Sequence, residues 1–392
     1  KRLMQEIRVD AYGIKIMMPK ATNYLIKINA LSNIAANILK QEMLSFGGDV
    51  AIARDSLTGK IKKTDCLLIG SLSQLSRLCA KLRKQPFGLS KVADCLSQAL
   101  SNYQKKNFRL DLGRYKLSLK EGKSCIMGIV NLTPDSFSGD GLYRFGVRSS
   151  EFGVSRIIDF IEKMVDEGAD IVDIGGESTR PGTRPITARE ELKRTIPVIK
   201  KISRKLKVPI SIDTSKAEVA RQALDNGVAI VNDIGGLRDP EMAKVVSGYK
   251  AGLVIMHMKG TPRTMQKNPE YDSLIDDITE YLSLALRRAV DSGIDKEKII
   301  VDPGIGFGKR VEHNLEILKN LREFKVLGRP LLVGPSRKSF IGKIIGVSAQ
   351  DSVFGTIASC IQAVRNGANI VRVHDVRAVK QSLKVSDSIN NI

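Results

Sequence analysis

Residues 208–233 read VPISIDTSKAEVARQALDNGVAIVND, and this stretch decides the fold. Two short apolar runs, Pro209–Asp213 and Ala229–Asp233, flank an amphipathic segment that is long enough for one helix. Short apolar runs bounded by polar residues are typical of buried strands, and strands that alternate with helices are typical of parallel pairing. The stretch therefore predicts one repeat of an α/β architecture.

The same alternation extends in both directions from this repeat. The predicted strands are Cys125–Asn131, Asp170–Ile174, Pro209–Asp213, Ala229–Asp233, Leu253–His257, Ile299–Asp302, Leu331–Gly334 and Ile370–His374. Eight β/α units within the 269 residues from Ser124 onward predict a (β/α)8 TIM barrel, a fold that takes about 250 residues. A doubly wound open sheet is the alternative, but no glycine-rich dinucleotide fingerprint opens the first helix.

Polar side chains stand at the carboxyl ends of these predicted strands. They are Asn131, Asp173, Asp213, Asn232, His257, Asp302, Ser336, Arg337, Lys338, Arg372 and His374. Each has an ordinary explanation when taken singly, since Asp302 precedes a proline and a lone His257 is usually a hydrogen-bonded core residue. In a TIM barrel, however, these strand ends converge on the face where the active site is built. The joint pattern therefore predicts an active site there.

The carboxylates and the amide in this set indicate a flat heterocyclic ligand. Asp213, Asp302 and Asn232 need hydrogen-bond donors inside an apolar barrel mouth, and a purine or pterin ring with amidine-like N–H groups supplies them. The loop DPGIGFGK, residues 302–309, matches no phosphate-binding glycine motif. We interpret its glycines as permitting close approach of a ring, with Phe307 as an apolar wall.

The cations in the set suit phosphate oxygens. They are Arg180, Lys338, Arg372 and His374. Asn131 is able to hold a magnesium-bound oxygen, whereas the few histidines and scattered cysteines disfavour zinc or iron. A phosphorylated heterocycle is therefore the predicted substrate class, with Mg²⁺ as cofactor. Two long polar segments, residues 131–149 and 175–187, are predicted to be mobile lids.

Eight sequence motifs carry a resemblance to a known family. In chain order they are MGIVNLTPDSFS, DIGGESTRPG, SIDTSK, NDI, IMHMKG, DPGIGFGK, GPSRKSFIG and RVHDV, between Met127 and Val376. With these motifs the chain resembles dihydropteroate synthase. The resemblance implies a transferase of folate biosynthesis that joins 6-hydroxymethyl-7,8-dihydropterin diphosphate to 4-aminobenzoate, releasing pyrophosphate and giving dihydropteroate.

The resemblance also implies roles for individual residues. The pterin would be bound by Asp213, Asn232, Asp302 and Lys338, with Met256 lining its pocket. The diphosphate would be held by Thr179, Arg180, Arg372 and His374. The aminobenzoate would be bordered by Phe307, Ser336 and Lys338. Asn131 would ligate magnesium. The predicted catalytic residues are Asp213, Asp302, Lys338, Arg372 and His374, which act by orientation and electrostatic stabilisation, since no strong general base is required.

Three loop positions depart from the family's pattern. Pro335 stands where Met or Thr is frequent, Ile305 stands where an aromatic residue is frequent, and residues 138–141 read SGDG in place of SDGG. These departures bear on affinity for aminobenzoate or sulfonamides rather than on the reaction.

Residues 1–108 are predicted to form a separate small α/β domain ahead of a synthase domain at 109–392. Helices are expected at 34–46, 72–82 and 91–103, and a strand at 65–71. A hairpin-like stretch at 109–119 leads into the barrel. Extensions of this kind precede the synthase in some members of the family, but the sequence assigns this one no function.

Charge and composition set limits on partners and location. The net charge is +21, and residues 1–123 hold 23 basic against 9 acidic side chains. Without an RNA-binding motif, a solvated surface is favoured over nucleic-acid binding. No run of 18 apolar residues and no hydrophobic signal core occur, and the five cysteines are scattered, so we expect a cytoplasmic protein with reduced thiols and no membrane partner. The family leads us to expect a homodimer.

Three alternatives remain at this point. A pterin-dependent methyltransferase shares the barrel and the pterin pocket, but it has no diphosphate to hold and would leave the cationic set unexplained. A synthase acting on a different arylamine would have the same pterin pocket. A nucleic-acid-binding protein would use the basic front domain beside a degenerate barrel, but the barrel motifs are complete.

Overall fold

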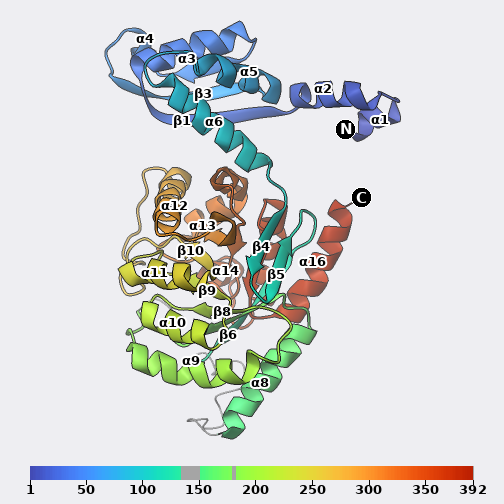
Figure 1. The fold of residues 1–392 in the computed structure, drawn as a ribbon, viewed down its shortest axis with the longest axis vertical. Helices are drawn as coiled ribbons and strands as arrows, with labels where there is room; N and C mark the ends of the chain where they lie inside the picture. The colour runs from blue at the N-terminus through green and yellow to red at the C-terminus, as the bar shows by residue number, and fades with distance from the viewer. Residues whose placement is uncertain (134–150, 179–181, 392) are drawn as a thin grey trace. The chain divides into compact units, whose positions relative to one another are not determined.

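The computed structural model of the chain describes residues 1–133, 151–178 and 182–391. The chain divides into two compact units, Lys1–Gln104 and Lys105–Ile392 (Figure 1). This division lies close to the domain boundary expected at 108/109. Within the described residues, no helix has both the length and the apolar character that crossing a membrane requires.

Unit 1 is a three-stranded antiparallel sheet with helices against one face. Its strand order is β1-β3-β2, with bounds Asn23–Ser32, Lys63–Ser71 and Asp49–Ile52. Every second residue of β3 is buried because successive side chains of a strand point to opposite faces. The helices are α1 (Arg2–Glu6), α2 (Ala11–Ala21), α3 (Asn33–Ser45), α4 (Arg54–Leu57), α5 (Leu72–Leu82) and α6 (Leu89–Gln104). The core of this unit lies between the sheet and these helices. It includes Leu39 of α3, Leu75 of α5 and Leu96 of α6.

The predictions for this unit are incomplete. The expected strand at 65–71 and the three expected helices are present as β3, α3, α5 and α6. Strands β1 and β2 and helices α1, α2 and α4 were not predicted. In β1 the period-two alternation of Tyr24, Ile26 and Ile28 is visible in the sequence, whereas β2 has only four residues.

Unit 2 contains a closed barrel of eight parallel strands, so the predicted fold class is confirmed. The strands are β6 (Cys125–Asn131), β7 (Ile171–Gly175), β8 (Ile210–Asp213), β9 (Ile230–Asp233), β10 (Gly252–Met256), β11 (Ile299–Asp302), β12 (Leu332–Val333) and β13 (Ile370–Val373). Neighbours in the chain are neighbours in the sheet from β6 to β11, and β13 pairs with both β12 and β6. A parallel bridge between Val301 and Leu331 closes the circle.

Helices surround the barrel and bury their apolar faces against it (Figure 1). They are α8 (Glu151–Asp166), α9 (Ala188–Ile202), α10 (Ala217–Asp225), α11 (Pro240–Tyr249), α12 (Leu274–Asp291), α13 (Val311–Lys319), α14 (Ser339–Ile345), α15 (Val353–Arg365) and α16 (Val376–Asn390), with 3-10 turns at Lys296–Lys298 and Leu321–Leu327. In α9, the Thr187 side chain caps the first turn and Ile196, Ile199 and Ile202 are buried.

A β-hairpin covers the amino-terminal end of the barrel, where a hairpin was predicted. Strands β4 (Phe108–Leu112) and β5 (Tyr115–Leu119) pair around a turn in which Gly113 has a φ of +72°. Leu110 and Leu119 are buried in one cluster with residues that begin the barrel strands, among them Ile171 and Ile370. This end of the barrel is therefore filled with apolar side chains.

Candidate active site

The carboxyl ends of the barrel strands carry a set that we call the polar layer. It consists of the buried Asp173, Asp213, Asn232 and Asp302 and the largely buried Arg372. Asp213 ends β8 and is paired in register with Gly175 of β7 and Asn232 of β9. Asp302 ends β11 opposite Met256 of β10. Parallel pairing thus brings residues that are distant in sequence to one face of the barrel, as predicted.

Arg372 links the carboxylates of the polar layer. Its Nε donates to Asp173 Oδ2 at 2.6 Å and its Nη2 donates to Asp213 Oδ2 at 2.6 Å. Asn232 Nδ2 also donates to Asp173 Oδ2, at 3.0 Å. The sequence assigned Arg372 to the diphosphate and gave Asp173 no role. In the structure, two barrel carboxylates hold Arg372.

Several buried oxygens of the barrel accept no hydrogen bond from the described residues. They are Asp173 Oδ1 and Asp213 Oδ1, with Ser211 Oγ beside them in the same strand as Asp213. A buried polar atom without a partner costs about 1–3 kcal/mol. A ligand that presents N–H donors to this layer would remove that cost.

Burial changes the protonation of these groups. It raises the pKa of Asp213 to about 7 against the opposing effect of Arg372, with Asp173 adding to the rise. Burial likewise raises the pKa of Asp302 to about 6, although the Gly304 N–H donates to its Oδ1 at 2.7 Å and favours the charged form. For Lys338, burial and then Arg372 lower the pKa to about 8. Two carboxyls and one amine of the site therefore titrate near neutral pH.

An apolar wall adjoins the polar layer. Met256 and Phe307 are buried in one small cluster with Ile234, Met258 and Met265. Lys338 Nζ lies 3.9 Å from the centroid of the Phe307 ring, a cation–π contact.

The structure gives a different role to one glycine of the 302–309 loop. At Gly304, with a φ of +73°, a Cβ would lie 1.9 Å from the His257 carbonyl oxygen. This glycine therefore permits close packing of the chain on itself, whereas we had expected it to admit a ring. Ile305 and Pro335 are both buried, and the SGDG segment lies outside the described residues.

Ser336, His374 and Asn131 form a second group at the same end. Ser336 Oγ lies 3.1 Å from His374 Nδ1 and accepts from the His374 backbone N–H at 3.2 Å. Asn131 Nδ2 lies 3.5 Å from His374 Nε2. No three His, Cys, Asp or Glu side chains among the described residues are grouped to hold a metal ion. Asn131 can offer one neutral oxygen ligand. A single protein ligand suits a magnesium ion, because most of the ligands of such an ion can be water and phosphate oxygens.

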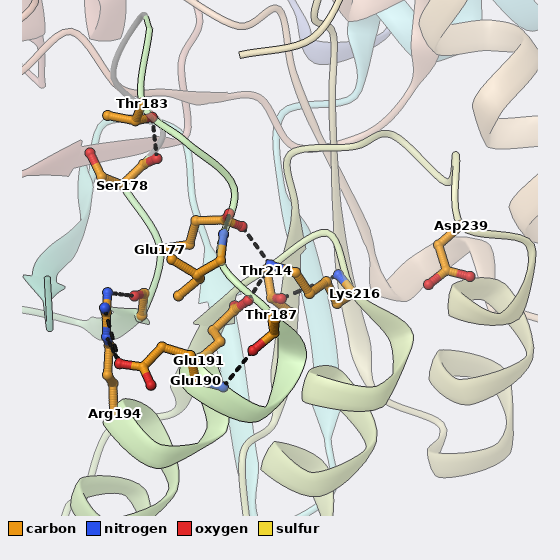
Figure 2. Close-up of polar contacts among 12 residues, drawn as sticks. Glu177, Ser178, Thr183, Thr187, Glu190, Glu191, Arg194, Thr214, Lys216 and Asp239 are labelled. Atoms are coloured by element: carbon orange, nitrogen blue, oxygen red, sulfur yellow. Dashed lines mark hydrogen bonds and ion pairs between the residues drawn. The ribbon is translucent and has the colours of Figure 1, made fainter. Parts of the chain in front are cut away.

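Salt bridges and hydrogen bonds tie the two arms of the loop after β7 to the barrel (Figure 2). Lys216 Nζ lies 2.6 Å from Glu177 Oε2 and 2.6 Å from Glu191 Oε2. Glu177 Oε1 accepts from the Ile186 N–H at 2.9 Å, and Thr183 Oγ1 donates to the Ser178 carbonyl at 2.7 Å. The predicted residues Thr179 and Arg180, and 134–149 of the other expected lid, lie outside the described residues.

Sequence reasoning missed Lys216, Glu177 and Glu191. Glu177 and Lys216 stand within the GGES and SIDTSK strings, directly after two strand ends, which is the signal that could have found them. Glu191 lies in the first turn of α9 and is fully buried, although nothing in the sequence distinguishes it from the partly exposed Glu190.

Comparison with known proteins gives consistent matches. Residues 127–374 match the family described as pterin binding enzyme. The chain is 47% identical over 269 residues to a dihydropteroate synthase of Synechocystis sp., covering 68% of this chain and 90% of that protein. A structure of the Xanthomonas albilineans dihydropteroate synthase in complex with 7,8-dihydropteroate is 35% identical, with a TM-score of 0.63, and the match covers 72% of this chain and 99% of that one.

One relative matches both units of this chain. A probable bifunctional folylpolyglutamate synthase/dihydropteroate synthase of Halobacterium salinarum is 37% identical over 386 residues. The match covers 98% of this chain and 45% of that protein. Similarity therefore extends through unit 1, beyond the residues of the pterin-binding family.

Proposed function

The chain belongs to the dihydropteroate synthase family of pterin-binding enzymes, and from this premise we propose how its own residues join the pterin diphosphate to 4-aminobenzoate. The product is 7,8-dihydropteroate, and the enzyme is a transferase of folate biosynthesis. The observation that carries the proposal is the polar layer, in which buried Asp213, Asn232 and Asp302 meet at one end of the barrel.

The pterin ring is assigned to this layer. Its amidine-like N–H groups would donate to the Asp213 and Asp302 carboxylates, which are nine-tenths or more buried, and the Asn232 amide would meet a further ring position. Met256 forms an apolar wall beside them. Because the dielectric constant is low there, each charge-assisted hydrogen bond is stronger than it would be in water.

The diphosphate is assigned to the cations at the edge of the layer. Lys338, Arg372 and His374 would stabilise the negative charge that develops on the leaving pyrophosphate. Arg372 is already paired with Asp173 and Asp213, so it would act on the diphosphate as a member of this charge network. Thr179 and Arg180 are assigned to the same group from the sequence alone.

Magnesium fits this arrangement as an ion that arrives with the diphosphate. Asn131 would supply one oxygen ligand, and the remaining positions suit phosphate and water oxygens. When bound, the ion would supply Lewis-acid stabilisation of the leaving group.

The aminobenzoate is assigned to Phe307, Ser336 and Lys338, the last of which stacks on the Phe307 ring. The neutral aniline nitrogen forms a bond to the exocyclic methylene carbon of the pterin, the carbon–oxygen bond to the diphosphate breaks, and the proton that the nitrogen then sheds leaves with pyrophosphate or water. Asp213 and Asp302 hold the ring in place and stabilise positive charge on it, and neither has to abstract a proton.

Pyrophosphate release tests the proposal. The parent protein, the pterin diphosphate and Mg²⁺ are mixed with a panel of arylamines, and phosphate is counted after pyrophosphatase is added. We expect turnover with 4-aminobenzoate and strong loss in Asp302→Asn, whereas Asp272→Asn, an exposed aspartate, should behave as the parent does. Turnover confined to another arylamine would correct the substrate, and no pyrophosphate release from any of them would refute the proposal.

Two further expectations, a homodimer and a cytoplasmic location, rest on the family and on composition. Sedimentation equilibrium tests the first, with a mass of twice the 43.0 kDa chain expected. Fractionation of cells that express the protein tests the second.

A further inference from the structure

A buried lysine next to the site has no role in the mechanism above. Lys309 closes the 302–309 loop and is only 3% exposed. Its Nζ lies 2.9 Å from His257 Nδ1 and donates to the Phe307 carbonyl oxygen at 3.0 Å. Lysine is almost never fully buried without partners, because removing an ammonium group from water is costly. These two contacts therefore indicate a specific use.

His257 is fixed and neutral. Its ring packs edge-on against Tyr281, with centroids 4.9 Å apart, and its backbone N–H donates to the Asp302 carbonyl at 2.9 Å. Burial, and then the nearby Lys309, lower its pKa to about 2. A neutral imidazole that receives a hydrogen bond from Lys309 at Nδ1 carries its proton on Nε2. His257 is thus a rigid hydrogen-bond partner for the amine.

The contacts of Lys309 fix one side chain of the active site. Three successive carbonyls of the loop each accept a side-chain hydrogen bond: Gly306 from Gln266 at 2.8 Å, Phe307 from Lys309 at 3.0 Å and Gly308 from Tyr271 at 2.8 Å. The carbonyl that accepts from Lys309 belongs to Phe307, and the centroid of the Phe307 ring lies 3.9 Å from Lys338 Nζ. Lys309 is therefore the anchor that holds the backbone of Phe307, the residue whose ring meets the Lys338 ammonium.

We propose that Lys309, held by His257, is a positioning residue that orients Phe307 and Lys338 for the arylamine. The inference rests on the proposed function, which places aminobenzoate against these two residues. Lys309 itself touches no reacting atom. A purely structural pair would stabilise the fold and affect both substrates alike, whereas a positioning pair acts on the arylamine side.

Steady-state kinetics on four variants of the full chain separate these roles. Lys309→Met removes both hydrogen bonds. His257→Leu removes the hydrogen-bond partner at Nδ1 but keeps the Lys309 amine, and His257→Asn restores a polar group near the position of Nδ1. Lys319→Met, on the exposed side of α13, is the control for loss of one positive charge.

We expect Lys309→Met and His257→Leu to raise the KM for 4-aminobenzoate about tenfold, equivalent to about 1.4 kcal/mol. For His257→Leu, the KM for the pterin diphosphate should change by no more than about twofold. Lys309→Met also removes a positive charge that lowers the pKa of Asp302, so its KM for the pterin diphosphate should rise as well, but by less than its KM for 4-aminobenzoate. His257→Asn should recover most of the loss, and the control should match the parent.

Two results would overturn the inference: an unchanged arylamine KM in the folded variants, or an equal rise in both KM values. If Lys309→Met does not fold, the two His257 variants decide the question. Failure of the proposed function is seen separately, since the parent itself would then release no pyrophosphate.

Discussion

The two ends of the barrel are built from the same eight strands but contain opposite kinds of side chain. At the amino-terminal end, Leu110 and Leu119 of the hairpin pack on Ile171, Ile230 and Ile370, all of them buried and apolar. At the carboxyl end, the polar layer holds three carboxylates and a guanidinium, and two carboxylate oxygens there have no partner among the described residues.

The difference separates stability from chemistry. Apolar packing at the hairpin end stabilises the barrel in proportion to the surface it buries. The polar layer holds charges that a stability-optimised core would lack, because each unpaired buried oxygen has a cost. Groups kept at such cost are the ones available to a ligand. Substitutions at the hairpin end should therefore lower the free energy of unfolding and leave pterin affinity unchanged, and substitutions in the polar layer should do the reverse.

The largest expected effect is at the hairpin end. Leu110→Ala should lower the free energy of unfolding of the barrel by about 3–5 kcal/mol, since it leaves a cavity at a fully buried position. Urea denaturation measures this, and calorimetry with a pterin analogue should show unchanged affinity. Leu117→Ala, at a partly buried position on the same hairpin, is the matched control with a smaller loss. A pterin affinity that falls with Leu110→Ala would contradict the separation.

The reverse signature is expected at the polar layer. Asp213→Asn and Asp302→Asn should each weaken pterin binding by about 2–4 kcal/mol, because a buried hydrogen bond loses its charge assistance. For Asp302→Asn the free energy of unfolding should stay constant or rise, since a desolvated charge is removed. Calorimetry and urea denaturation test the two statements, with Asp272→Asn as control. Parent-like pterin affinity in both variants would show that the pocket is misplaced.

The contrast between the two ends also explains what the sequence could predict. Strands and their polar ends follow from local patterns, and Asp213, Asn232 and Asp302 lie at or next to the carboxyl ends of their strands, where those patterns put them. The partner of a polar residue is a different matter. Arg372 was assigned to a diphosphate, yet it pairs with Asp173 and Asp213, which lie 199 and 159 positions away. A cation at a strand end looks the same in sequence whether its partner is a ligand or a carboxylate.

Lys309 shows the same limit. Its hydrogen-bond partner His257 is 52 positions away, and the sequence left His257 open between an active-site residue at a strand end and an ordinary hydrogen-bonded core residue. In unit 1, strands β1 and β2 were missed for a different reason. They bury one face of a sheet in which each pairs with the more distant strand β3, so their pairing is not local. Local periodicity thus identifies elements, while long-range contacts decide partners.

A smaller effect is expected from pH. In the ligand-free protein, burial raises the pKa of Asp213 to about 7 and that of Asp302 to about 6. A pterin that donates N–H groups binds the ionised carboxylates, so affinity should fall about fifteenfold between pH 7.5 and pH 6.

The effect of pH on the stability of the fold has the opposite sign to its effect on pterin affinity. The folded state holds these protons more tightly than the unfolded chain, whose aspartates titrate near pH 4. The contribution of these carboxyls to stability is therefore largest at low pH and is lost as pH rises through 6 and 7.

Calorimetry in buffers of different ionisation enthalpy should detect proton release on pterin binding near pH 6. No proton release would contradict the assignment, and Asp302→Asn should reduce the release.

The smallest effect is expected from removing unit 1, and it tests whether the hairpin belongs to the barrel. Every residue of the polar layer lies in unit 2, and so does the hairpin. Deleting residues 1–104 should therefore leave kcat/KM within about twofold of the parent, less than about 0.5 kcal/mol. Deleting residues 1–123 also removes β4 and β5 and uncovers the apolar ends of the strands, so this longer truncation should unfold or aggregate. Gel filtration, circular dichroism and pyrophosphate release distinguish the two. If the shorter truncation is folded but inactive, unit 1 contributes to the site, and catalysis does not belong to the barrel alone.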